Sequence, residues 1–135
     1  MLDTLPDFKK YVFVYGTLRE GEERDINRLQ PVPLFIGNSK TSGTLYNLGT
    51  YPGVRLGGQN YVQGEVYQIE ADLERQLDEI EGVWPQKTGE YIRREIVVQC
   101  RGKDVICLVY EAADVQVIGK VVILSGDWIK REANV

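Results

Sequence analysis

The stretch YVFVYGTLR, residues 11–19, predicts the first element of the fold, a strand that ends in a tight loop. Its first five residues are aromatic or β-branched, which is typical of a strand, and the Gly16-Thr17 pair ends that strand. A strand that breaks at Gly-Thr exposes backbone N–H groups, and glycine lets a ligand approach the backbone closely. Such a nest of N–H groups can hold a carboxylate or an oxyanion. The same pattern also occurs in ordinary turns, so a binding loop and a plain turn are both open on this pattern alone.

Short runs rich in Val, Ile and Tyr recur between turn-forming residues in the rest of the chain. They predict strands at residues 35–37, 41–46, 61–69, 91–99 and 105–110. Loops are expected around Pro31 and Pro33, at residues 51–53, and at Gly57 and Gly58.

Two segments are predicted to be helical, a short charged one over residues 22–29 and an amphipathic one over residues 72–81. Many strands with two separated helices favour an α+β fold with a closed or strongly curled sheet. A length of 135 residues fits one domain, so we expect residues 1–135 to form a single domain.

The predicted helix over residues 72–81 has one apolar stripe. Leu73, Leu77 and Ile80 recur at the helical spacing, and this stripe must face the core. Asp78 and Glu79 project away from the stripe and are expected to point to solvent. Truncation of the apolar stripe is therefore expected to destabilise the fold.

Glu81 differs from these two carboxylates. On a helical wheel with about 100° per residue it lies about 80° from Leu73, on the flank of the buried stripe. It is also the last residue before Gly82, where the helix dipole disfavours negative charge. Partial burial and the dipole both raise the pKa of a carboxyl group towards neutrality, which suits a general base. The alternative is a solvated glutamate at a frayed helix end.

The composition excludes several classes of function. The net charge of −4 argues against nucleic acid or anionic membranes as partners. No apolar stretch is long enough to cross a bilayer, and the first ten residues, MLDTLPDFKK, lack the layout of a signal peptide. We therefore expect a cytoplasmic protein.

The chain has no histidine, which excludes Ser-His and Cys-His nucleophilic pairs and the commonest zinc sites. Two cysteines cannot close a zinc site, and no phosphate-binding or dinucleotide-binding motif is present. We expect neither a metal nor a cofactor. Acid-base chemistry must then come from carboxylates, lysines, tyrosines or thiols.

The two cysteines flank a turn that we predict at residues 101–104. In a hairpin closed there, Cys100 lies opposite Val105 and Cys107 lies opposite Val98. The two cysteines are then diagonal neighbours, with Cα atoms about 7 Å or more apart, which is too far for an easy disulfide. We expect two free thiols, as in a reducing compartment.

A set of motifs runs through the chain in a fixed order. They are VFVYGTLR at 12–19, GTLY at 43–46, YPG at 51–53, VQGEVY at 62–67, LDEIEG at 77–82, YIR at 91–93 and SGDW at 125–128. As an ordered set they resemble the gamma-glutamylcyclotransferases, including the small AIG2-like members.

The resemblance implies a compact β-barrel flanked by helices, with a cavity between a glutamate and a ligand-binding loop. The family's catalytic glutamate matches Glu81, and its binding loop matches Tyr15, Gly16, Thr17 and Leu18. The implied reaction is cyclisation of a gamma-glutamyl amide, in which the α-amine attacks the γ-carbonyl, 5-oxoproline forms and an amine is released. Glu81 acts as general acid and base. The resemblance implies that no metal, cofactor or covalent intermediate is needed.

The sequence departs from the family's pattern in two segments, the charged residues 20–25 and the loop at residues 83–90. Both are expected to border the pocket, so they affect which substrate is bound more than which reaction takes place. Two alternatives follow: an enzyme on the same scaffold acting on another γ-glutamylated small molecule, and a non-catalytic small-molecule-binding module. The sequence leaves the released amine and the oligomeric state open.

Overall fold

The computed structural model describes residues 10–131, so the expectation about a signal peptide lies almost entirely outside the described residues. Six strands form one sheet in the order β4-β5-β1-β3-β2-β6. They are β1 (Lys10–Val14), β2 (Leu34–Asn47), β3 (Pro52–Ile69), β4 (Tyr91–Cys100), β5 (Lys103–Ala112) and β6 (Val121–Val122). One α-helix, α1 (Ala71–Ile80), and two 3-10 helices, η2 (Ile26–Arg28) and η3 (Asp114–Val117), complete the described part. No helix in it is long and apolar enough to span a membrane.

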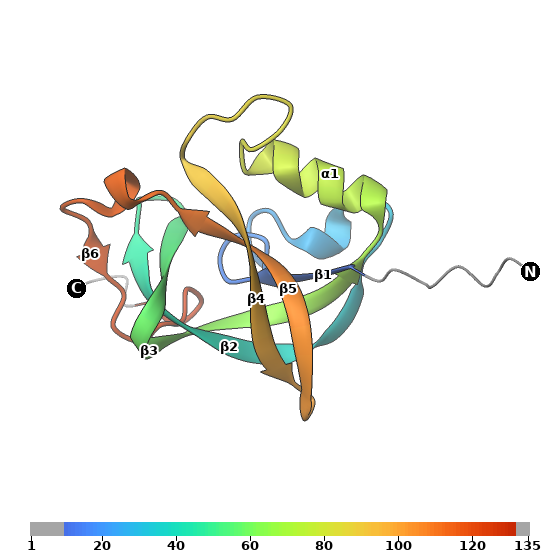
Figure 1. Ribbon diagram of the computed structural model, residues 1–135, viewed down its shortest axis with the longest axis horizontal. Helices are drawn as coiled ribbons and strands as arrows, with labels where there is room; N and C mark the ends of the chain where they lie inside the picture. Colours follow the sequence, from blue (N-terminus) through green and yellow to red (C-terminus); the bar gives the residue numbers. More distant parts are fainter. Residues whose placement is uncertain (1–9, 132–135) are drawn as a thin grey trace, which may run out of the picture.

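The sheet is mixed and strongly curled (Figure 1). β1 pairs antiparallel with β3 and parallel with β5, while β2 and β3 form a long antiparallel hairpin. The curl brings β2 towards β4, where the Ser39 hydroxyl donates to the Gln99 carbonyl at 2.6 Å. The predicted α+β class with a strongly curled sheet is therefore confirmed, with one α-helix over the end of the sheet.

From Val12 onward β1 is buried on both faces, which explains the run of apolar residues there. Phe13 and Tyr15 point into the cluster inside the curl, and Val12 and Val14 point into the cluster beneath α1. Alternation along a strand sends successive side chains to opposite faces, so the same five residues supply both cores. The loop after β1 therefore leaves a well-anchored strand.

α1 packs onto the sheet through the stripe that the sequence predicts. Leu73 and Leu77 are fully buried, and Ile80 packs against the same cluster. The helix ends in a Schellman motif, because Gly82 has a φ of 73° and the N–H groups of Gly82 and Val83 donate to Glu79 and Asp78. Glu81 is the C-cap residue, one position beyond the helix.

The predicted helix over residues 22–29 is wrong. Only Ile26–Arg28 forms a single 3-10 turn, and the residues before it form successive tight turns. The Asp25 carboxylate accepts hydrogen bonds from the backbone N–H groups of Gly21 and Asn27, each at 2.9 Å. Such local side-chain bonds stabilise turns in competition with a helix.

The expected strands at residues 35–37 and 41–46 belong to one longer strand, β2. The expected loop at residues 51–53 contributes its last two residues to β3, which then runs on to Ile69. The glycine pair does interrupt the ladder, since Gly57 and Gly58 both have positive φ angles and the register jumps between Leu56 and Tyr61.

The β4–β5 hairpin is tighter than predicted. It turns at Arg101 and Gly102, whose φ angles of 54° and 78° suit a two-residue turn, so Cys100 pairs with Lys103 and Cys107 with Ile96. The predicted register is therefore wrong by two positions. The expectation of free thiols is confirmed: both cysteines are free and buried.

Candidate active site

A cavity of about 350 Å³ opens where α1, the loop after β1 and the loop before β4 meet. Its walls come from residues 13–18, from residues 79–82 at the end of α1, from Tyr51 and Pro52, and from Tyr91 and Tyr110 on the adjoining hairpin. Arg24, Thr88 and Glu90 border it as well. All five residues that the sequence singles out, Glu81 and residues 15–18, therefore line one cavity.

The loop at residues 16–18 lines this cavity, and its N–H groups are not used in the described part of the fold. The three carbonyl groups accept bonds within the loop, from the backbone N–H groups of Arg19, Arg24 and Ile26 at 2.9–3.0 Å. The N–H groups of Gly16, Thr17 and Leu18 have no acceptor among residues 10–131. Consecutive free N–H groups form an anion-binding concavity.

Buried charges hold this loop in place. The Arg19 guanidinium contacts Glu65 on β3 at 3.0 Å and Asp127 near the C-terminal end of the described chain at 2.8 Å. Glu65 also accepts from the Glu20 N–H and from the Tyr67 hydroxyl, each at 2.9 Å. A charge buried with this many partners keeps the backbone in one conformation.

Gly16 is required by close packing. A Cβ atom there would lie 2.7 Å from Cγ of Pro52, well inside van der Waals contact. Pro52 cannot give way easily, because its carbonyl accepts a hydrogen bond from the Tyr91 hydroxyl at 2.7 Å. Glycine therefore lets the loop backbone pack directly against Pro52, which also lines the cavity.

Glu81 is partly buried, and its carboxylate makes no hydrogen bond or ion pair with any residue from 10 to 131. Burial raises the pKa of Glu81 to about 7, with Arg24 acting against this shift and Glu90 adding to it. Of the two causes proposed from the sequence, partial burial agrees with the largest of these effects, and the helix dipole is not among them. A carboxyl group with this pKa can both accept and donate a proton near neutral pH.

Tyrosine hydroxyls around the cavity are held by fixed acceptors. Tyr15 donates to the Tyr110 carbonyl at 2.6 Å and accepts from the Val54 N–H at 3.3 Å. Tyr110 in turn donates to Asp78 at 2.6 Å. Burial is the main cause that raises the pKa of Tyr15 and Tyr110, so both phenols stay protonated and serve as rigid walls.

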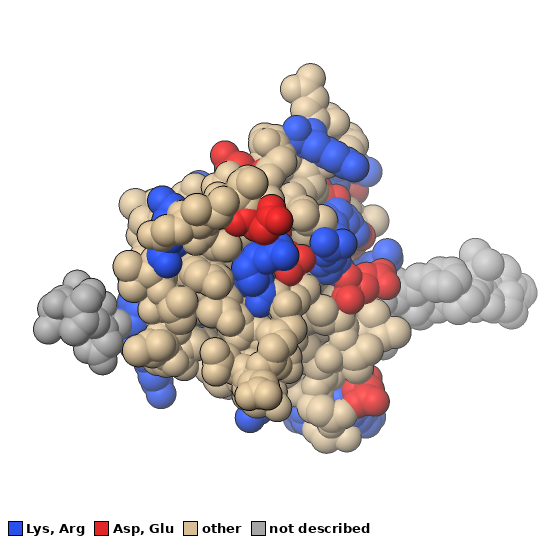
Figure 2. Space-filling view, turned by 60° about the vertical axis from the view of Figure 1, so that its left-hand side comes forward, with Lys and Arg blue, Asp and Glu red and all other residues tan. Residues whose placement is uncertain are grey.

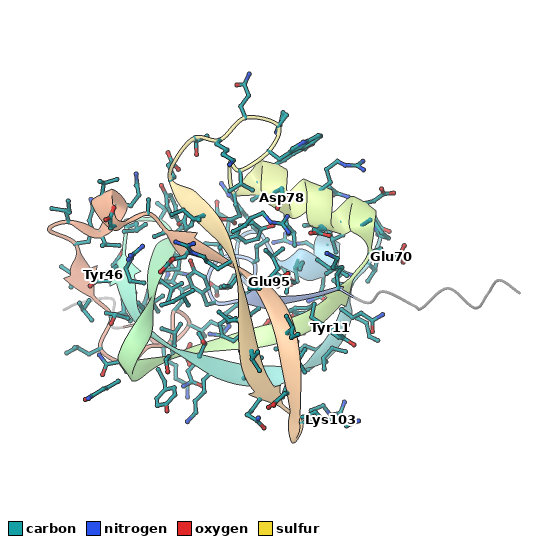
Figure 3. The ribbon with its side chains drawn as sticks, in the orientation of Figure 1. Tyr11, Tyr46, Glu70, Asp78, Glu95 and Lys103 are labelled. Atoms are coloured by element: carbon teal, nitrogen blue, oxygen red, sulfur yellow. The ribbon has the colours of Figure 1, made fainter. Side chains whose placement is uncertain are left out.

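The expectation that Asp78 points to solvent is wrong. It lies on the side of α1 that faces the β4–β5 hairpin (Figure 3), where it accepts from Tyr110 and, at 2.7 Å, from Arg93. Glu79 is exposed, as predicted. The wheel placed Asp78 off the apolar stripe correctly, but β4 and β5 pack beside the helix and supply partners that the wheel cannot show.

Sequence reasoning missed Tyr91, Tyr110 and Arg24 as cavity residues. No spacing in the chain signals the two tyrosines, because they come from separate strands. Arg24 and Glu90 fall in the two segments that the resemblance placed beside the pocket, and that expectation is confirmed. Trp84 is not among the residues that line the cavity; the residue is 44% exposed, and its ring centroid lies 5.9 Å from the Arg75 guanidinium.

Outside the cavity, the charged side chains within residues 10–131 give no sign of a second centre. Over residues 10–131, no three His, Cys, Asp or Glu side chains are placed to hold a metal ion. On the face shown in Figure 2, basic and acidic side chains are interleaved, so the described residues there form no extended basic patch. The cavity is the place where chemistry-bearing groups converge.

The family model "Gamma-glutamyl cyclotransferase, AIG2-like" matches residues 12–130. The chain belongs to this family. A relative from Vibrio cholerae, with the name "Putative gamma-glutamylcyclotransferase", is 37% identical over 89% of this chain and 96% of its own. A second, from Niallia circulans, is named "Gamma-L-glutamyl-butirosin B gamma-glutamyl cyclotransferase" and is 36% identical over 55% of this chain and 47% of its own.

The fold agrees with this membership. The solved structure of an AIG2-like protein from Mus musculus is 30% identical, covers 78% of each chain and superposes with a TM-score of 0.67. The family member described here is thus an enzyme of the gamma-glutamylcyclotransferase type.

Proposed function

We propose that this gamma-glutamylcyclotransferase cyclises a γ-glutamyl amide to 5-oxoproline and releases the amine, with Glu81 as general base and acid. The observation that carries the proposal is one cavity lined by two features. One is a partly buried carboxylate whose pKa is raised to about 7, and the other is the loop at residues 16–18, whose N–H groups are free. Both features are needed for acyl transfer near neutral pH.

Each step of the proposed reaction has a group in the cavity to perform it. Glu81 takes a proton from the substrate's α-ammonium, and the free amine attacks the γ-carbonyl carbon to form a five-membered ring. The carbonyl oxygen becomes an oxyanion, which the N–H groups of Gly16, Thr17 and Leu18 stabilise. The protonated Glu81 then gives its proton to the departing nitrogen as the bond from that nitrogen to the carbonyl carbon breaks. The ring nitrogen passes its second proton through Glu81 to the released amine, so the products are 5-oxoproline and an ammonium ion, and Glu81 ends in its carboxylate form.

The cavity contributes by holding the substrate in a reactive shape. Nucleophile and electrophile belong to one molecule, so the enzyme's task is to fold the glutamyl chain and keep the amine near the carbonyl. Walls formed by Tyr15, Tyr91 and Tyr110 are fixed by their hydroxyl hydrogen bonds. A rigid cavity of about 350 Å³ fits a glutamyl group with part of its amine.

A non-catalytic binding module is the second candidate from the sequence. The buried, unpaired carboxylate of Glu81 argues against a binding module. A buried carboxylate without a partner costs stability at neutral pH, and binding alone gains little from a group that resists ionisation. An enzyme that moves a proton gains directly from the same property.

A panel of γ-glutamyl amides tests the proposal. The substrates share the glutamyl part and carry an alkylamine, an anilide, an α-amino acid or a polyamine; 5-oxoproline and the amine are measured by mass spectrometry. We expect equal amounts of both products from at least one substrate. The matched N-acetyl compound lacks a free α-amine and should release nothing. Amine release from the N-acetyl compound would instead indicate hydrolysis, and no product from any substrate would favour the binding module.

A further inference from the structure

The substrate proposed above carries negative charge in two places. Its α-carboxylate is charged throughout, and its γ-carbonyl oxygen becomes charged during the reaction. The free N–H groups of residues 16–18 form one concavity, and an anion that occupies it in the ground state would exclude the oxyanion later. A second anion-binding group is therefore needed in the same cavity.

Three arginines lie in and beside the loop after β1, and two of them are already engaged. Arg19 is buried against Glu65 and Asp127. Arg28 donates to the carbonyls of Glu22 and Glu23 at 2.9 and 2.7 Å. These two guanidinium groups hold the loop itself.

Arg24 is different. Its backbone N–H donates to the Thr17 carbonyl at 2.9 Å, which fixes its Cα beside the free N–H groups. Its side chain borders the cavity, and within the described part of the chain the guanidinium makes no hydrogen bond or ion pair. It is the only cationic side chain among the described residues that line the cavity; the charged others are Glu79, Glu81 and Glu90.

We propose that Arg24 binds the α-carboxylate of the γ-glutamyl substrate, which leaves the N–H groups of residues 16–18 free for the oxyanion. This inference rests on the proposed function and names the residue that selects the glutamyl group. The head of the substrate is a zwitterion, with an ammonium and a carboxylate on one carbon. Glu81 and Arg24 present the complementary pair of charges in one cavity.

The electrostatics of Glu81 support this placement. Arg24 lowers the pKa of Glu81 against the effect of burial and acts in the same direction on Tyr91, so its charge acts on two residues that line the cavity. Arginine also suits the role chemically, because its planar guanidinium binds a carboxylate through two parallel hydrogen bonds.

The test compares two substrates on three variants. The substrates are L-γ-glutamyl anilide, whose only anionic group is the α-carboxylate, and its α-carboxamide analogue, which has none. The variants are Arg24→Gln, Arg24→Lys, and Arg101→Gln as a control at the far tip of the β4–β5 hairpin with the same change of charge. We expect Arg24→Gln to raise KM for the anilide about 10- to 100-fold with little change in kcat, as for the loss of a charged hydrogen bond. Arg24→Lys should recover part of the loss, and Arg101→Gln should behave as the unmodified enzyme.

The carboxamide analogue makes the result specific to the carboxylate. The unmodified enzyme should prefer the anilide to this analogue about 10- to 100-fold, and Arg24→Gln should treat the two alike. An Arg24→Gln enzyme that keeps the preference would overturn the inference while leaving the cyclisation itself intact.

Binding of the product separates this inference from the proposed function. Calorimetry with 5-oxoproline and with 2-pyrrolidinone, which lacks the carboxylate, needs no turnover. We expect the unmodified protein to bind 5-oxoproline more tightly and Arg24→Gln to bind both equally weakly. If the unmodified protein binds the two compounds equally, the assignment of Arg24 is contradicted. If the protein prefers the carboxylate compound, loses that preference in Arg24→Gln and yet forms no 5-oxoproline, the assignment of Arg24 holds and the proposed reaction is contradicted.

Discussion

Arg19 and Glu65 form a buried ion pair, with Nε of the arginine 3.0 Å from Oε2 of the glutamate. The pair joins the loop after β1 to the C-terminal part of β3, so it connects that loop to the sheet. Glu65→Gln removes one of the two carboxylates that neutralise the buried Arg19 guanidinium. We expect this variant to lower the free energy of unfolding by about 3–5 kcal/mol, measured by urea denaturation at pH 7.

An exposed ion pair serves as the control for Glu65→Gln. Asp72 and Arg75 are 3.8 Å apart, and their side chains are 75% and 58% exposed. Asp72→Asn should change the free energy of unfolding by less than about 1 kcal/mol. Equal, small effects of the two substitutions would show that the Arg19 network does not hold the loop.

Glu81→Gln tests the proposed acid-base role. Glutamine has nearly the same shape but cannot take and return a proton, so kcat should fall by about 10²–10⁴ on a substrate that the panel identifies. KM should change much less, because other groups bind the glutamyl part. Glu95→Gln makes the same substitution on the exposed face of β4 (Figure 3) and should leave both constants unchanged. A Glu81→Gln enzyme with a near-normal kcat contradicts the assignment.

The pH dependence of kcat/KM should report the pKa of Glu81. The base must be ionised to act, so activity should fall as the pH drops through about 7. Glu90 raises this pKa and Arg24 lowers it. Glu90→Gln should therefore move the acid limb to lower pH, and Arg24→Gln should move it to higher pH. An acid limb near pH 4, unmoved by either variant, would mean that Glu81 is solvated.

The raised pKa of Glu81 also predicts an effect on stability. The folded protein holds this proton more tightly than the unfolded chain, so stability is lost as the pH rises from about 4.5 to about 7. Glu81→Gln removes that cost. It should increase the free energy of unfolding by about 1–3 kcal/mol at pH 8 and by much less at pH 5. Urea denaturation at the two pH values measures the difference; a destabilised variant at pH 8 would be inconsistent with a buried, unpaired carboxylate.

Asp78 should matter for stability, although it takes no part in the proposed reaction. It accepts from Tyr110 and Arg93 and so ties α1 to the β4–β5 hairpin. Asp78→Asn should lower the free energy of unfolding by about 1–3 kcal/mol, and its effect should not add to that of Tyr110→Phe. Glu79→Gln, one residue further on and exposed, should leave the free energy of unfolding nearly unchanged. Thermal melts of all these variants measure the differences. Full additivity of Asp78→Asn and Tyr110→Phe would show that the hydrogen bond contributes nothing.

The chain's local patterns predicted several features correctly for clear physical reasons. The aromatic and β-branched residues before Gly16 favoured β1, and the spacing of Leu73, Leu77 and Ile80 indicated α1, because a helix places residues at that spacing on one face. Gly82 marked the helix end, since the residue there has a left-handed φ that glycine adopts readily. The position of Glu81 on the helix flank follows from the same geometry.

Errors arose where local bonding or pairing decided the structure. Asp25 satisfies backbone N–H groups in turns, and this outweighed the helical character of residues 22–29. The β4–β5 register depended on whether the turn used two residues or four, and Arg101 and Gly102 both adopted positive φ angles. A register cannot be read from an apolar pattern when both candidate pairings keep the same side chains inside.

The sequence by itself determined that β1 and α1 form, that α1 ends before Gly82 and which carboxylate lies on its inner flank, because these depend on neighbours within a few residues. Only the tertiary structure decided which groups share the cavity. Glu81, the loop at residues 16–18, Arg24 and Tyr110 come from distant parts of the chain, and the curl of the sheet brings them together. The tertiary structure also decided the partners of Asp78 and Arg19, because a buried charge pairs with the polar groups that pack against it from other elements.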